Sequence, residues 1–68
     1  MKTVQVSSSS ISEVGFGNGT LEITFTNGKT YQYFNVPEET FEEMIASDSV
    51  GKFFNSVIRN NYSSIKLN

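Results

Sequence analysis

The stretch from Leu21 to Pro37, LEITFTNGKTYQYFNVP, constrains the fold of this chain more than any other. Residues that favour β-strands lie on both sides of Asn27-Gly28, the dipeptide that best tolerates the positive φ angles of a tight hairpin turn. Pro37 follows the second strand and suits the first position of a helix, where its missing N–H costs no hydrogen bond. The stretch therefore predicts a β-hairpin that leads directly into a helix.

The spacing of apolar residues decides between two possible turns for this hairpin. Leu21 and Ile23 share one face of the first strand, and Tyr31 and Tyr33 share one face of the second. A two-residue turn would pair Ile23 with Gln32 and bury an unpaired amide, at a cost of about 1–3 kcal/mol. A three-residue turn with a glycine bulge shifts the register and places both tyrosines beside Leu21 and Ile23. We therefore predict the bulged turn.

Two amphipathic helices are predicted after the hairpin. The first begins at Pro37 and carries Phe41, Met44 and Ile45 at the i, i+3, i+4 spacing of a helix that lies on a sheet. The second follows a break at residues 47–49. Its apolar stripe consists of Val50, Phe53, Phe54, Val57 and Ile58.

The whole chain is predicted to be an α+β domain with the element order β-β-β-α-α. The strands of its antiparallel three-stranded sheet are expected at Ile11–Phe16, Thr20–Thr26 and Thr30–Val36. Both helices pack on one face of that sheet. Ile11 is out of phase with Val14 and Phe16, which indicates a bulge in the first strand. Residues 1–8 form either a flexible arm or an edge strand, and residues 63–68 form a tail.

Size and composition exclude several classes of function. The 68 residues are too few for two cores, so the chain is one domain. It has no cysteine and no histidine, which excludes disulfides and the usual zinc ligand sets, so stability must come from helix–sheet packing or from self-association. The net charge of −2 argues against capture of duplex nucleic acid. Because no apolar run could span a membrane and no signal-peptide pattern is present, we expect a cytoplasmic protein without a membrane partner.

Tyr31 and Tyr33 form an aromatic pair on one strand face, and two interpretations of the pair stay open. The rings could stack on a nucleic-acid base, which contributes about 1–3 kcal/mol per base. Alternatively they are the sheet's part of the hydrophobic core, with their hydroxyls at its edge. The predicted hairpin register favours the second interpretation.

The second helix also predicts a site for an anion. Ser49 and Gly51 lie at its start, where free N–H groups and a small residue let a phosphate approach closely. Lys52, Asn55 and Arg59 follow at spacings that place them along one strip of the helix surface. We therefore predict that these residues bind a phosphate or carboxylate group.

A purely structural interpretation of the same helix remains open. Asp48 would then cap the helix and pair with Lys52, and Arg59 would lie near the negative end of the helix dipole. Gly51 would serve close packing against the sheet. This alternative assigns no ligand to the segment.

The sequence predicts no catalytic chemistry. Glu38, Glu39, Glu42 and Glu43 form an acidic face near the start of the first helix, which is typical of a solvated surface. The tract from Ser7 to Ser10 has no histidine or acidic residue placed to activate a nucleophile. We therefore expect a protein that is not an enzyme and that needs neither cofactor nor metal.

Three consecutive blocks of this chain resemble the KTSC domain family, named from an extension at the C-terminus of some lysyl-tRNA synthetases. The blocks are SSSSISEVGF, LEITFTNGKTYQYFNVPEE and SDSVGKFFNSVIRNNY, and the likeness runs from about Val6 to Tyr62. The Y-x-Y that marks the family is Tyr31-Gln32-Tyr33 here, and Val36-Pro37 follows at the expected distance. The resemblance implies a small α+β domain and, through the synthetase link, an RNA-binding role.

The chain departs from the family pattern at three aromatic positions. Phe16-Gly17 stands where a Tyr-Asp is usual, and Phe53 replaces a common tyrosine. After Tyr62, Ser63-Ser64 lacks the further aromatic residue often found there. If the phenol groups at these positions contact a ligand in the family, the resemblance does not carry that contact over to this chain.

These observations lead to one preferred function and two alternatives. We expect a self-associating module, from a bacterium or a phage, that holds a phosphate-bearing ligand such as a small nucleotide or nucleotide signal. Lys52, Asn55 and Arg59 would bind the phosphate, and Tyr31 and Tyr33 the base. The alternatives are a protein–protein interaction module without a small ligand and an accessory domain that binds RNA or tRNA.

Overall fold

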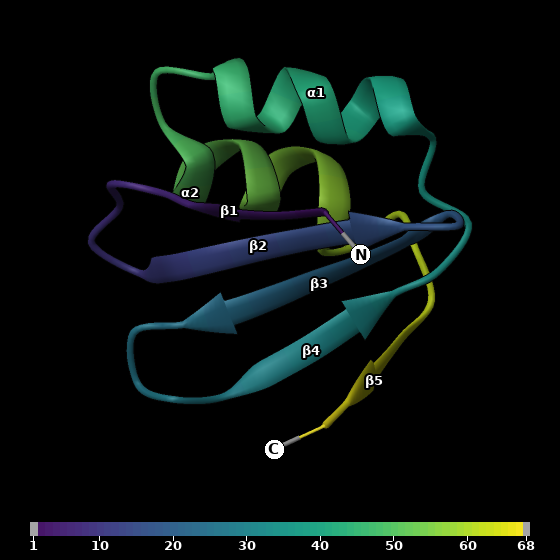
Figure 1. Ribbon diagram of the computed structural model, residues 1–68, viewed down its shortest axis with the longest axis horizontal. Helices are drawn as coiled ribbons and strands as arrows, with labels where there is room; N and C mark the ends of the chain where they lie inside the picture. Colours follow the sequence, from purple (N-terminus) through teal and green to yellow (C-terminus); the bar gives the residue numbers. More distant parts are fainter. Residues whose placement is uncertain (1, 68) are drawn as a thin grey trace.

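A computed structural model describes residues 2–67 of the chain. In sequence order the elements are β1 (Lys2–Gln5), β2 (Ile11–Gly17), β3 (Thr20–Phe25), β4 (Thr30–Tyr33), α1 (Glu38–Ala46), α2 (Val50–Phe53), the π-helical turn η1 (Phe54–Ile58) and β5 (Ser64–Lys66) (Figure 1). No helix formed by these residues is long and apolar enough to cross a bilayer.

The sheet has five antiparallel strands in the order β1-β2-β3-β4-β5, so the predicted three-stranded sheet is wrong, although the α+β class is right. At the N-terminal end, the alternative of an edge strand holds, because Lys2–Gln5 pairs with β2. At the C-terminal end, the predicted tail contains Ser64–Lys66, which pairs with β4. Both added strands are short and lie at the edges of the sheet. Their own sequences contain few apolar residues, so the strand conformation depends on pairing with the neighbouring strand and not on local strand propensity.

The hairpin between β3 and β4 has the predicted bulged register. Leu21 pairs with Tyr33, and Ile23 pairs with Tyr31. The Phe25 N–H donates to the Lys29 carbonyl at 2.8 Å across a three-residue turn, in which Gly28 adopts a φ of +90°. A positive φ of this kind is inexpensive only for glycine, which explains the residue at this position. The predicted bulge in β2 is also present, between Ile11 and Glu13.

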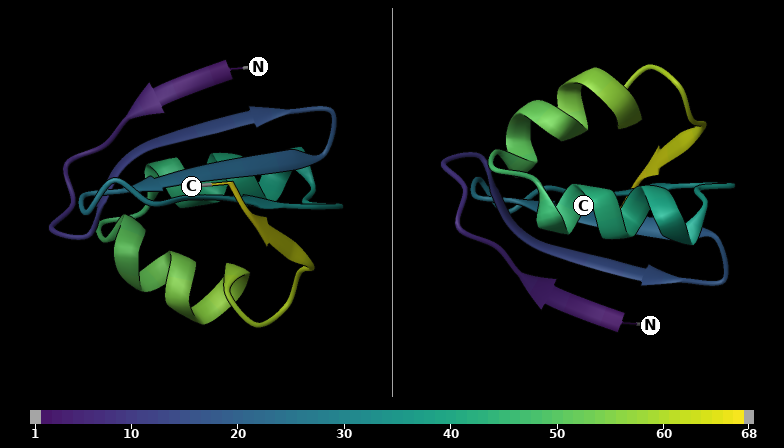
Figure 2. Two further views of the ribbon diagram at one scale, coloured as in Figure 1. Left: turned by 90° about the horizontal axis from the view of Figure 1, so that it is seen from below. Right: turned by 90° about the horizontal axis from the view of Figure 1, so that it is seen from above.

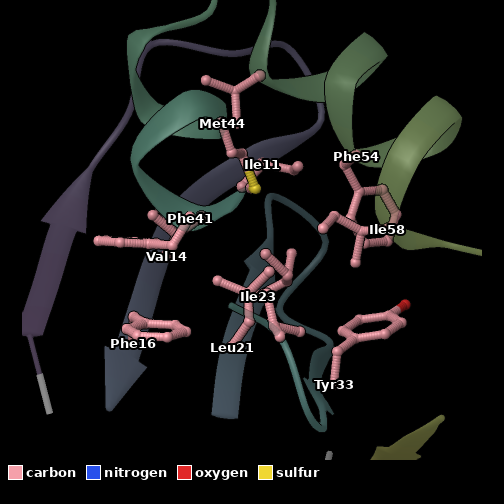
Figure 3. Packing of buried hydrophobic residues seen from close by; sticks show 12 residues of the cluster. Ile11, Val14, Phe16, Leu21, Ile23, Tyr33, Phe41, Met44, Phe54 and Ile58 are labelled. Atoms are coloured by element: carbon pink, nitrogen blue, oxygen red, sulfur yellow. The ribbon is translucent and has the colours of Figure 1, made fainter. Parts of the chain in front are cut away.

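Both helices lie over the same face of the curved sheet, as the two views in Figure 2 show. The Phe16 ring of β2 stacks on the Phe41 ring of α1, with centroids 4.9 Å apart. The Tyr33 ring of β4 meets the Phe54 ring of η1 edge-on, with centroids 5.4 Å apart. Figure 3 shows the buried side chains of this single core between the two layers. Burial of these side chains is the main source of stability in a chain without disulfides.

The helices begin and continue differently from the prediction. Pro37 is the N-cap of α1, so the helix proper starts at Glu38. Ser49, and not Asp48, caps α2, because its side chain accepts a hydrogen bond from the Lys52 N–H. The second helix changes to π geometry after four residues, as shown by the bond from the Arg59 N–H to the Phe54 carbonyl at 2.9 Å. Phe54 and Ile58 of this segment are buried in the core, and Phe53 and Val57 of the predicted apolar stripe are half-buried.

Candidate functional site

Four aromatic rings meet where the hairpin faces η1. Phe25 contacts Tyr31 at 5.9 Å and Phe54 at 5.4 Å between ring centroids, in both cases edge to face. Tyr31 lies beside Tyr33 at 6.5 Å with the rings 30° apart. Tyr33 completes the group through its contact with Phe54. We call these residues the aromatic cluster; it joins β3, β4 and η1 at one end of the core.

A cavity of about 380 Å³, which we call the aromatic cavity, opens over the aromatic cluster. Its walls add two cationic side chains, Lys29 and Arg59, and two amide side chains, Asn27 and Asn55, to the four aromatic ones. None of the described residues that line it carries a carboxylate. The cavity therefore combines apolar ring surface with hydrogen-bond donors and positive charge, although the chain as a whole has a net charge of −2.

Local backbone geometry brings these polar groups to the aromatic cluster. Asn27 and Lys29 come from the bulged turn, where the Asn27 side chain accepts a hydrogen bond from the Lys29 N–H at 3.0 Å. Asn55 and Arg59 come from η1 and the residue after it. Lys66 of β5 pairs with Tyr31, and directly paired residues share a sheet face. A third cation therefore lies on the strand next to the cavity.

The hydroxyl of Tyr33 is a polar group on a largely buried side chain that lines this cavity. Tyr33 is only 5% exposed, and its ring is part of the core (Figure 3). No buried side-chain oxygen or nitrogen of the described residues lacks a hydrogen-bond partner. The Tyr33 hydroxyl has no such partner among these residues, so its oxygen keeps some exposed surface. An unpaired polar group on a largely buried side chain is costly unless water or a ligand satisfies it.

Burial raises the pKa of the Tyr33 phenol above its ordinary value of 10.0; the neighbouring Tyr31 raises it further, and Arg59 lowers it. The raised pKa means that folding favours the neutral phenol, so this contribution to stability is complete below pH 10.0 and is lost as the pH rises through the pKa of the folded state. We expect the free energy of unfolding, measured by urea titration, to fall above that pH, and to fall less steeply in Tyr33→Phe. Equal slopes in the two proteins would contradict this assignment.

A second hollow, of about 370 Å³, lies at the start of α2, and we call it the serine-walled hollow. The loop of residues 7–10 forms one wall, and Ser49, Gly51, Lys52 and Asn55 contribute to the other. A Cβ atom on Gly51 would lie 3.0 Å from the Ser10 hydroxyl oxygen and 3.4 Å from that of Ser8. Gly51 therefore allows close packing, but against the serine loop and not against the sheet as the structural alternative supposed.

The residues predicted to form one site are divided between the two hollows. Tyr31, Tyr33, Asn55 and Arg59 line the cavity over the aromatic cluster. Ser49, Gly51 and Lys52 line the serine-walled hollow, and Asn55 reaches both. The helix therefore does not present Lys52 and Arg59 to a single cavity. No ion pair joins Asp48 to Lys52; the described residues contain one, between Lys2 and Glu42 at 3.4 Å.

Sequence reasoning missed half of the residues that line the aromatic cavity. Phe54 was assigned only to the apolar stripe of its helix and Asn27 only to the turn, and Phe25 and Lys29 were assigned to no site. The bulged register was the available signal, because it brings the turn residues next to Tyr31. The acidic face of α1 plays no part, and no group of three or more potential metal-ligating residues occurs within residues 2–67.

Comparison with known proteins identifies the family. The model of the KTSC domain matches residues 7–62. A protein of Tsukamurella paurometabola is 34% identical over 64 residues, which cover 91% of this chain and 96% of that protein. An uncharacterized protein of Stutzerimonas stutzeri is 36% identical over 61 residues, which cover 87% of this chain and 86% of that protein.

A solved structure has the same fold. The crystal structure of a KTSC domain protein from Yersinia pestis is 37% identical to this chain and superposes with a TM-score of 0.90, covering 98% of this chain and 97% of the other. The fold described above therefore closely matches that of a protein whose crystal structure has been solved. From the family match over most of its length and the likeness of both sequence and structure, this chain belongs to the KTSC domain family.

Proposed function

We propose that this KTSC domain is a cytoplasmic, non-catalytic module that binds a small phosphate-bearing aromatic ligand, a nucleotide, in the cavity over the aromatic cluster. The observation that supports the proposal most is the composition of that cavity. Aromatic walls, two amides and two cations surround an opening to which no carboxylate of the described residues contributes. Ring surfaces stack with bases, amides hydrogen-bond base edges, and cations bind phosphate oxygens.

The burial of each side chain suggests its role. Tyr31 is half-buried, so part of its ring remains available to a base. Tyr33 is a core residue that offers only its hydroxyl, which revises the expectation of two equivalent stacking rings. Arg59 and Lys29 are exposed at the rim, where they would bind phosphate oxygens. Lys52 belongs to the other hollow and receives no role in this proposal.

The dimensions favour a small ligand over a long one. A volume of about 380 Å³ lies near the lower end of the roughly 300–1,000 Å³ typical of small-molecule sites. A ligand of one nucleotide unit is therefore a better match than a duplex, which would also meet the acidic surplus of the chain. A short single-stranded RNA end could enter the same cavity with one base.

Calorimetric titration with mononucleotides, cyclic nucleotides, dinucleotides and short RNAs tests the proposal. We expect a mononucleotide or a cyclic nucleotide to bind, and Tyr31→Ala to weaken that binding by about 1–3 kcal/mol, or roughly 5- to 160-fold, because the stacking surface is removed. Tyr62→Ala serves as the matched control, since Tyr62 is also half-buried but does not line the cavity.

Each other result of the titration has a defined meaning. Equal losses in the two tyrosine variants would contradict the assignment of Tyr31 to the base. Binding of RNA alone, with an affinity that falls steeply with salt, would favour the RNA-binding alternative. Absence of any nucleotide binding would leave the protein–protein interaction module as the function to pursue.

A further inference from the structure

The free edge of β5 is the surface of this molecule that is best suited to a second copy of the chain. In Figure 1 β5 is the lowest strand of the sheet, and β4 is its neighbour on one side only. Of the described residues, the two large hydrophobic side chains that are exposed are Ile65, at 50%, and Leu67, at 49%. Both belong to this edge, whereas the outer face of β1 at the opposite edge carries the polar residues Thr3 and Gln5.

Main-chain hydrogen bonds show which groups of β5 are available. The Ser63 carbonyl accepts from Phe34 at 2.9 Å, and the Leu67 N–H donates to Thr30 at 2.8 Å. Since successive residues of a strand direct their main-chain groups to alternate sides, Ser63, Ile65 and Leu67 are oriented toward β4. Ser64 and Lys66 therefore direct their N–H and C=O groups to the free edge.

We propose that two copies of the chain associate through antiparallel pairing of β5 with β5 about a twofold axis at Ile65. In this register Ser64 of one copy exchanges two main-chain hydrogen bonds with Lys66 of the other, and the reverse pair does the same. The two Ile65 residues then form a non-hydrogen-bonded pair, in which side chains come closest, with Cα atoms about 4.5 Å apart.

Side-chain chemistry selects this register over its neighbours. Ile65 pairs with Gln32, so it lies on the outer sheet face, and Leu67 shares that face because it is two residues further along the strand. A twofold axis at Lys66 would place two lysines directly opposite each other, which is destabilising. An axis at Ser64 would pair Ile65 with Ser63 and separate the two isoleucines. The axis at Ile65 is thus the one that joins the apolar side chains without opposing like charges.

The association joins two five-stranded sheets through their edges. Because paired residues share a face, the helices and the aromatic cavities of both copies lie on the same side of the joined sheet. The contact is small compared with the roughly 800 Å² per partner of a standard interface, so we expect a dimer that forms with increasing concentration. The inference rests on β5 alone and does not depend on the proposed ligand.

Single cysteine variants test the register, because the natural chain contains no cysteine. We expect mild oxidation of Ile65→Cys to yield a disulfide-linked dimer, since the paired Cα atoms would lie within the range that a disulfide spans. Lys66→Cys is the matched control. Its two cysteines would lie diagonally across the paired strands, with Cα atoms roughly 8 Å apart, so no disulfide should form between them. Equal cross-linking of the two variants would overturn the register.

Sedimentation equilibrium tests the association itself. We expect the mass of the natural chain to rise from 7.6 kDa toward twice that value with concentration, and Ile65→Lys to remain at the monomer mass. Lys66→Pro should have the same effect, because it removes an outward N–H and leaves the bonds to β4 in place. Circular dichroism should show that both variants stay folded. A natural chain that remains monomeric at millimolar concentration, or a dimer that both variants preserve, would overturn the proposal.

Discussion

Phe41→Ala should unfold a large part of the protein under conditions in which the natural chain is folded. Phe41 has no exposed surface, and its ring stacks on Phe16 with the ring planes 13° apart. Truncation of a buried phenylalanine costs about 3–5 kcal/mol, because apolar burial is lost and a cavity remains. At about 0.05–0.15 kcal/mol per residue, a chain of 68 residues has a total stability of roughly 3–10 kcal/mol. Urea titration followed by circular dichroism measures the difference.

Glu43→Ala is the control for this experiment. Glu43 lies on the same helix but is exposed, so its truncation should change the free energy of unfolding by no more than about 0.5 kcal/mol. A loss below about 1 kcal/mol in Phe41→Ala would show that α1 does not depend on the stacked pair with β2, and it would contradict the single core described here.

Arg59→Glu should abolish measurable binding of the nucleotide that the calorimetric titration identifies. Arg59 lines the aromatic cavity, and the substitution replaces its charge-assisted hydrogen bonds to a phosphate with repulsion. Loss of the bonds alone is worth about 1.5–3 kcal/mol, or roughly 10- to 160-fold in affinity, and the introduced carboxylate should weaken binding further. Calorimetry at the concentrations used for the natural chain provides the measurement.

Lys52→Glu separates a local contact from a general effect of charge. It changes the net charge by the same amount as Arg59→Glu, and both side chains are exposed on the same helical segment, but Lys52 lines the serine-walled hollow. We expect Lys52→Glu to reduce affinity by no more than a few-fold through long-range electrostatics, which salt should suppress. If the two reversals weaken binding equally, the phosphate is not bound at the aromatic cavity.

The candidate site was predictable where its residues depend on local rules. The alternation of β3 and β4 together with the Asn27-Gly28 turn placed Tyr31 and Tyr33 on the inner face, and the structure has that register. Asn55 and Arg59 were expected on one polar strip of the helix together with Lys52; Asn55 and Arg59 line the aromatic cavity, whereas Lys52 does not. The change to π geometry at Phe54 was not predicted, because the winding of the last turns of the second helix depends on how that helix packs on the sheet.

The sequence by itself determined the hairpin, its register, the order of the helices and the faces they bury, because each depends on contacts between residues close along the chain. Only the tertiary structure decided that β1 and β5 extend the sheet to five strands, since a short edge strand has one buried face at most and takes its conformation from the strand beside it. The tertiary structure also decided that Arg59 lines the aromatic cavity and Lys52 lines the serine-walled hollow. Helical spacing places residues on a strip of the helix, whereas the loop and the sheet packed on either side of that strip determine what each residue faces.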